Sequence, residues 1–177
     1  MKKPSFLLAL VLLLQGHLTY AQTGGTVTPL SDAQKSFEMM KALAGNWQGP
    51  VTVENPSWAT DKPLYVTMRV ASQGNALIHE LKEPNTPEVT IIYLENDQIA
   101  MVHYCDFKNR PLMRARPVAD GSKIEFEFAE MTGIDAPGHV THCVFNIIDT
   151  AHHTEDWTFS IPGQKPFHAI MDLKRVQ

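Results

Sequence analysis

The sequence has 177 residues, of which 44% are hydrophobic and 19% charged, with two cysteines and a formal net charge of -4. These values are typical of one globular domain and exclude a disordered or fibrous chain. No run of lysine and arginine occurs, which disfavours a nucleic-acid partner. The sequence also lacks a glycine-rich phosphate loop, a GxSxG elbow and an EF-hand pattern, so the familiar hydrolases and nucleotide enzymes lose support.

The first residues have the pattern of a secretory signal peptide. Lys2 and Lys3 precede an apolar run over 6–14, and Thr19 and Ala21 supply small residues before a cleavage point. The run is too short to span a bilayer, which needs about 20 apolar residues, and no longer run follows. We therefore expect residues 1–21 to be removed, with no membrane span, leaving a soluble periplasmic or secreted protein.

A helix is predicted at the start of the mature domain. After a segment over 22–30 that we expect to be flexible, Phe37, Met40 and Leu43 recur near helical spacing. Ser31 or Asp32 can cap the start of the helix, and Gly45 can end it. We assign residues 31–177 to one domain that begins with about three turns of helix.

From Trp47 onward the apolar period changes to two, and turn-forming residues recur at the interval of about 8 to 12 residues expected of an all-β domain. The connections are short and contain no helix, so sequential antiparallel pairing is the economical topology, and closure into a barrel removes the exposed edges. We predict an all-β fold, in which one helix precedes a ten-stranded antiparallel up-and-down barrel. The predicted strands are 47–54, 64–72, 76–83, 88–95, 98–106, 112–118, 123–130, 139–148, 153–160 and 165–175.

The ninth predicted strand carries a candidate buried acid. Trp157 and Phe159 fix its inward face, which turns Glu155, and His153 with it, toward the interior. Such a carboxyl can act as a general acid or base with a raised pKa. The alternative is a structural carboxylate satisfied by arginine or tyrosine, and we favour it.

In two predicted strands the sequence does not decide which face points inward, because both faces carry apolar residues. In the fifth, either His103 and Cys105 or Tyr104 point inward, and we favour the first. In the third, either Glu80 or His79 does so.

We expect a polar site at one rim of the barrel. Strands five and six form a hairpin around 108–111, which would place Cys105 and Arg114 at the same end, with Arg114 paired to Glu80 or Glu155 because a buried charge needs a partner. The alternative, an outward and solvated Arg114, stays open. The predicted ligand-binding residues are His103, Tyr104, Cys105, Arg114, Glu80, Glu155 and Trp157.

No cofactor is expected, although two weaker hypotheses, a metal site and a disulfide, stay open. His103 and Cys105 share a strand face, and together with the pair His153 and Glu155 they could hold zinc or copper, but no CxxC or HExxH spacing supports this. An exported chain with two cysteines suggests a bridge between Cys105 and Cys143. Their predicted strands are not neighbours, which favours two buried thiols.

Three motifs resemble those of a known group of proteins. Residues 43–49 (Leu-Ala-Gly-Asn-Trp-Gln-Gly) resemble the Gly-x-Trp signature that follows the N-terminal helix in lipocalin-like (calycin) barrels. The segments 102–105 and 109–115 resemble the Thr-His-Tyr-Cys, Asn-Gln-Pro and Met-Arg-Ala pattern of exported bacterial lipocalin-like proteins without an assigned function, with Val102 in place of Thr and Arg110 in place of Gln. Residues 155–157 are similar to that group's Glu-Glu-Trp. The resemblance implies a calycin barrel, with Trp47 plugging the end beneath the helix.

A weaker resemblance is to nitrobindin-type haem barrels, which also have ten strands. Their haem-ligating histidine stands seven residues before a terminal arginine, as His168 stands before Arg175. Strand alternation turns His168 outward, however, which argues against haem.

We interpret the protein as an exported binding protein for a small hydrophobic or amphipathic molecule, because lipocalin-like relatives mostly bind such ligands. The alternatives are a barrel enzyme with isomerase- or cyclase-type acid-base chemistry, and a haem- or metal-binding barrel. We expect a binding protein rather than an enzyme.

Overall fold

The computed structural model describes residues 29–82, 87–116, 122–134 and 138–177. The predicted signal peptide and most of the segment expected to be flexible lie outside these ranges. The described part begins with one helix, α1 (Asp32–Ala42), and continues as strands with two short 3-10 turns, η1 (Pro56–Trp58) and η2 (Ser72–Gly74). In the described part of the chain, no helix is both long enough and apolar enough to cross a bilayer. The strands are β1 (Gly45–Gly49), β2 (Val51–Val53), β3 (Leu64–Ala71), β4 (Ala76–Leu81), β5 (Glu88–Glu95), β6 (Gln98–Tyr104), β7 (Asn109–Ala115), β8 (Lys123–Gly133), β9 (His139–Asp149), β10 (His152–Ser160) and β11 (Phe167–Val176).

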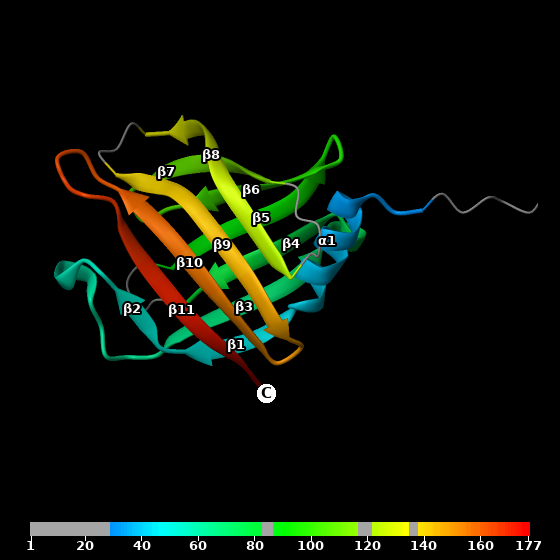
Figure 1. Cartoon of the computed structure of the whole chain (residues 1–177), viewed down its shortest axis with the longest axis horizontal. Coiled ribbons are helices and arrows are strands. Elements are labelled where there is room, and N and C mark those ends of the chain that lie inside the picture. Colours follow the sequence, from blue (N-terminus) through cyan, green and yellow to red (C-terminus); the bar gives the residue numbers. More distant parts are fainter. Residues whose placement is uncertain (1–28, 83–86, 117–121, 135–137) are drawn as a thin grey trace, which may run out of the picture.

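The strands form a closed antiparallel barrel (Figure 1). From β3 to β11 each strand pairs with the next along the chain, and both β1 and β2 pair with β11, while β1 also pairs with β3. The predicted first strand is therefore present but divided at Pro50, which has no N–H to donate to a sheet. Counting β1 and β2 as one interrupted strand, the ten-stranded up-and-down barrel is confirmed.

Closure requires a close approach between the first and last strands. A Cβ atom on Gly49 would lie 1.7 Å from the backbone oxygen of Asp172. Only glycine allows the two backbones to come this near, so residue 49 is part of what closes the barrel.

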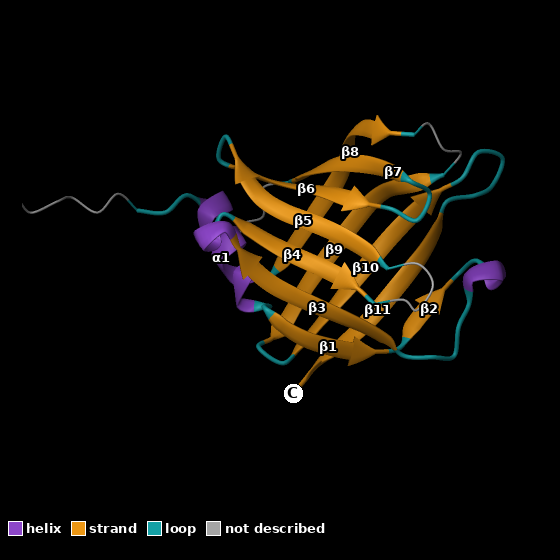
Figure 2. Ribbon diagram, turned by 180° about the vertical axis from the view of Figure 1, so that it is seen from behind, coloured by secondary structure: helices purple, strands orange, loops and turns teal. Residues whose placement is uncertain are grey.

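The helix covers one end of the barrel, which we call the capped end (Figure 2). Ser31 begins α1 with a capping box that involves Gln34, and Phe37 and Met40 are buried beneath it. Trp47 is fully buried, and its indole N–H donates to the carbonyl of Leu43 at 2.8 Å. Trp47 thus plugs the barrel under the helix, as the resemblance implied.

Strand alternation fills the interior with apolar side chains. In β8, Ile124 and Phe126 are buried while Glu125 points outward, and in β6 the inward set is Ile99, Met101 and His103, which is the parity that we favoured. We call the other end of the barrel the distal end.

Candidate functional site

A cavity of about 360 Å³ occupies the distal end of the barrel. One wall is apolar and comes from β2, β3, β10 and β11, with Val51, Leu64, Phe159, Ala169 and Met171 among its residues. The facing wall comes from β4, β5, β6 and the turn after β6, and it is mostly polar. The polar residues of this wall are His79, Glu88, Thr90, His103, Cys105 and Asp106, and its apolar residues are Leu81 and Phe107.

An aromatic cluster lies beside the apolar wall. The Trp58 ring packs against Phe107, Phe159 and Phe167 at centroid distances of 5.6, 5.2 and 5.0 Å. Trp58 itself is 39% exposed, and it belongs to η1, which Figure 2 shows at the opposite end from α1. The cluster therefore joins the cavity wall to the surface of the distal end.

Glu155 lies beneath the cavity and is fully buried. Its carboxylate accepts hydrogen bonds from His79 Nε2 at 3.0 Å, His153 Nε2 at 3.0 Å and Trp157 Nε1 at 2.9 Å. Burial alone would raise the pKa of Glu155, but the charge of His79 and the hydrogen bonds from both histidines hold it well below its usual range. Burial likewise opposes the charge on His79, yet the Glu155 carboxylate raises the pKa of His79 overall. The two groups form a buried imidazolium–carboxylate pair.

His103 has one satisfied ring nitrogen and one that faces the polar wall. Its Nδ1 lies 2.8 Å from the Thr90 hydroxyl, whereas Nε2 has no hydrogen-bond partner among the described residues and lies 3.7 Å from a Glu88 oxygen. Burial, together with the charge of His79, lowers the pKa of His103 to about 3. The ring is therefore neutral near pH 7.

Glu88 and Cys105 complete the polar wall next to His103. The Glu88 carboxylate accepts the backbone N–H of Asp106 at 2.9 Å, and burial raises the pKa of Glu88. Burial also raises the pKa of the Cys105 thiol, to about 12, with the Glu88 charge adding to the effect. An isolated Cys105 thiol is thus protonated and a poor nucleophile.

Four of the seven predicted ligand-binding residues point into the barrel. His103, Cys105 and Trp157 line the cavity. Glu155 lies behind them and reaches the cavity through the side chains of His79 and Trp157, to which it is hydrogen-bonded.

Tyr104 and Glu80 face outward, so their expected place in the cavity was wrong. Tyr104 is 44% exposed, as its neighbour His103 takes the inward side of β6. Glu80 lies 3.6 Å from Arg69 on the outer face of β4, because Leu77 and His79 are the buried side chains of that strand. The alternative parity of the third predicted strand, with His79 inside, is therefore correct.

The predicted position of Arg114 was also wrong. The inward side chains of β7 include Met113 and Ala115, so Arg114 faces outward and pairs with Glu95 at 2.8 Å rather than with Glu80 or Glu155. Strand β7 begins at residue 109, earlier than expected, and Arg114 lies opposite Ala100 rather than close to the turn. It is therefore nearer the capped end than Cys105 is.

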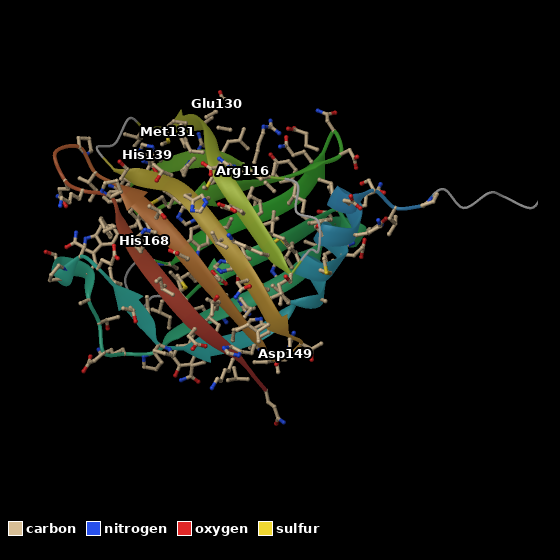
Figure 3. All side chains as sticks on the ribbon, viewed as in Figure 1. Arg116, Glu130, Met131, His139, Asp149 and His168 are labelled. Atoms are coloured by element: carbon tan, nitrogen blue, oxygen red, sulfur yellow. The ribbon has the colours of Figure 1, made fainter. Side chains whose placement is uncertain are left out.

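The structure changes the set of residues that could bind a metal, and it does not support haem binding by His168. His153 packs edge-on against Trp47 at a centroid distance of 4.3 Å, so it does not join His103 and Cys105. Instead, Glu88 does, and the donor atoms of these three residues lie within 4.8 Å of one another. His168, labelled in Figure 3, is partly exposed on the outer side of β11 and binds Asp156 at 2.7 Å. It offers no ligand atom to the cavity.

Cys105 and Cys143 are both buried and free. Sequence reasoning missed Glu88 and Thr90, although their period-two spacing in β5 places both on one strand face. What it lacked was the register that sets Thr90 opposite His103.

Comparisons with known proteins identify the fold. No protein-family model and no curated protein matches the sequence. Among solved structures, the chain is similar to the crystal structure of Rv2717c from M. tuberculosis, with a TM-score of 0.58 and 15% sequence identity over 80% of this chain and 98% of that one. At this identity the similarity concerns the fold alone, and it agrees with a closed antiparallel barrel.

Proposed function

We propose that the protein is an exported, periplasmic or secreted, binding protein that holds a small amphipathic molecule in the distal end of its barrel. The observation that carries the proposal is the cavity of about 360 Å³ with one apolar and one polar wall. This volume falls within the range of about 300–1,000 Å³ typical of small-molecule sites. The signal-peptide pattern over 1–21 supports export.

The two walls suggest how such a ligand lies. Its apolar body packs against side chains such as Leu64, Phe159 and Met171, and its polar group meets the unpaired Nε2 of His103. Leaving a buried imidazole nitrogen unpaired costs free energy, so a ligand group that pairs with it gains selectivity as well as affinity. A purely apolar molecule would leave that cost in place.

The two carboxylates among the predicted site residues, Glu155 and Glu80, do not support the enzyme alternative. Glu155 is held by three donors and has a lowered pKa, which makes it a poor general base. Glu80 lies on the outer surface, away from the cavity. Glu88 lines the cavity and burial raises its pKa, so the enzyme alternative would rest on Glu88.

A cavity-filling variant tests the proposal. The purified protein is titrated with a fluorescent fatty-acid probe, and energy transfer from tryptophan reports binding. Ala169→Trp places an indole in the cavity and should weaken binding at least about tenfold, because it occupies the volume that the probe needs.

The matched control is Ile170→Trp, which adds the same side chain on the outward face of β11, where Ile170 is 41% exposed. It should bind the probe as the unmodified protein does. Equal binding by both variants, or no binding by the unmodified protein across probes with different polar groups, would contradict the proposal. The exported protein should also begin at Gln22 by mass spectrometry.

A further inference from the structure

We infer that Glu88, His103 and Cys105 form a binding site for a divalent transition-metal ion, best suited to Zn²⁺, in the polar wall of the cavity. Each residue offers one donor atom, and the three atoms lie within 4.8 Å of one another. The ion would take the nitrogen of His103 that the proposed function pairs with the ligand's polar group, so with the ion bound that polar group would meet the ion instead.

The separation between His103 and Glu88 agrees with tetrahedral coordination, and Cys105 lies within 4.8 Å of both. Zinc bonds of about 2.0–2.3 Å place neighbouring ligand atoms about 3.3–3.8 Å apart. His103 Nε2 lies 3.7 Å from Glu88 Oε2, which is too long for a hydrogen bond but within this range. Small side-chain adjustments therefore bring the three donors around one ion.

The unpaired nitrogen of His103 is an independent indication of a ligand. Its side chain is 4% exposed, and Nε2 is buried without a hydrogen-bond partner in the described part of the chain. Its other nitrogen, Nδ1, is held by the Thr90 hydroxyl at 2.8 Å. Metal-binding histidines commonly have one nitrogen fixed in this way, which directs the lone pair of the other toward the ion.

The donor set selects the class of metal. A thiolate, an imidazole and a carboxylate suit Zn²⁺ and Co²⁺, whereas Mg²⁺ and Ca²⁺ require oxygen ligands. On binding, the ion displaces the thiol proton of Cys105. Three protein ligands leave a fourth position that faces the cavity and is open to water or to a ligand atom.

A second cluster of possible donors serves as an internal comparison. Glu125, Glu127 and His142 also lie close together, but on the outer face of β8 and β9. There His142 Nε2 already binds Glu125 at 2.9 Å, and Glu125 also pairs with Lys123. This cluster is a set of paired surface charges.

Cobalt titration of the metal-free full protein tests the inference without any organic ligand. We expect one Co²⁺ per chain with a thiolate-to-cobalt absorption band, displacement by Zn²⁺, and no effect of Mg²⁺. Cys105→Ala should abolish the band, and Glu88→Gln should weaken binding at least about tenfold. Thr90→Val, which removes only the group that orients His103, should weaken it about 10- to 100-fold.

Two control variants distinguish this site from the second buried thiol and from the surface cluster. Cys143→Ala removes that thiol, and His142→Asn disrupts the surface cluster; both should leave the band and its affinity unchanged. Far-ultraviolet circular dichroism checks that each variant is folded. Absence of the band in the unmodified protein, its persistence in folded Cys105→Ala, or its loss in His142→Asn would overturn the inference. Because no fatty-acid probe is present, failure here is distinct from failure of the proposed function.

Discussion

The buried polar residues of the barrel divide into satisfied and unsatisfied groups. Glu155 has three donors, and each of its oxygens is paired. His103 keeps one nitrogen without a partner among the described residues, although it is nearly as buried. A satisfied network stabilises one arrangement of the core, whereas an unpaired group adds cost until something binds it. Asn109 Oδ1 and His153 Nδ1 are also buried without a partner among the described residues, but of these three side chains only His103 lines the cavity, where a bound group could reach it.

The Glu155–His79 pair should make stability depend on pH. The pKa of His79 is raised above its ordinary 6.5, so its contribution is fully present below that pH and is lost as the pH rises through the folded-state pKa. The pKa of Glu155 is lowered from 4.5, so its contribution persists to acid pH. At pH 6, Glu155→Gln should reduce the free energy of unfolding by about 3–5 kcal/mol, because it leaves a buried charge unpaired.

Urea unfolding at several pH values measures this effect as the difference between the unmodified protein and Glu155→Gln. The difference should shrink as the pH rises beyond 6.5, because the charge on His79 is then lost. The control Glu127→Gln, on the outer face, should change stability by at most about 0.5 kcal/mol. A difference that grows with pH would contradict the charged state of His79.

At the scale of elements, period-two alternation was sufficient to predict the strands but not every inward face. β8 alternates between apolar and acidic residues, so the sequence was sufficient to identify its inward face. β4 has apolar residues on both faces, so the sequence could not decide between His79 and Glu80; neighbouring strands decide it, since only one face packs on the core. Arg114 was misplaced for a different reason, because β7 begins at Asn109, two residues before Pro111. The contact between Glu88 and His103 depends on register between strands, which no local pattern encodes.

Barrel closure gives a prediction for one residue of β1. In Gly49→Ala the new methyl group would collide with the backbone oxygen of Asp172, at 1.7 Å, so β1 and β11 must separate. We expect the free energy of unfolding to fall by about 3 kcal/mol, as in other overpacked sites.

Chemical denaturation measures this loss, with Thr52→Ala on the exposed side of β2 as the control. The control should lie within about 0.5 kcal/mol of the unmodified protein. If Gly49→Ala were equally stable, the close contact that joins the first and last strands would be incorrect.

The two ends of the barrel differ in how they are packed, and the proposed binding site lies at only one of them. At the capped end, α1, Trp47 and Arg175 are packed together, with the guanidinium 4.3 Å from the Trp47 ring and hydrogen-bonded to the carbonyls of Ala42 and Ala44. At the distal end, no described helix covers the cavity, and a partly exposed tryptophan, Trp58, lies in its wall. A barrel built in this way can keep an unfilled interior at one end because the other end supplies the packing.

The same substitution at Trp47 and at Trp58 tests whether the two ends contribute separately to stability and to probe binding. Trp47→Phe removes the indole N–H, leaves the Leu43 carbonyl unpaired and weakens the contact with Arg175, so the free energy of unfolding should fall by about 1–3 kcal/mol. Affinity for the fatty-acid probe in the folded protein should stay within about twofold, because distant sites contribute independently. Trp58→Phe should do the reverse, weakening probe binding while changing stability by less than about 1 kcal/mol, since its ring is 39% exposed. If Trp47→Phe lowered probe affinity as much as Trp58→Phe does, the two ends would be coupled, and binding would depend on the packing beneath the helix.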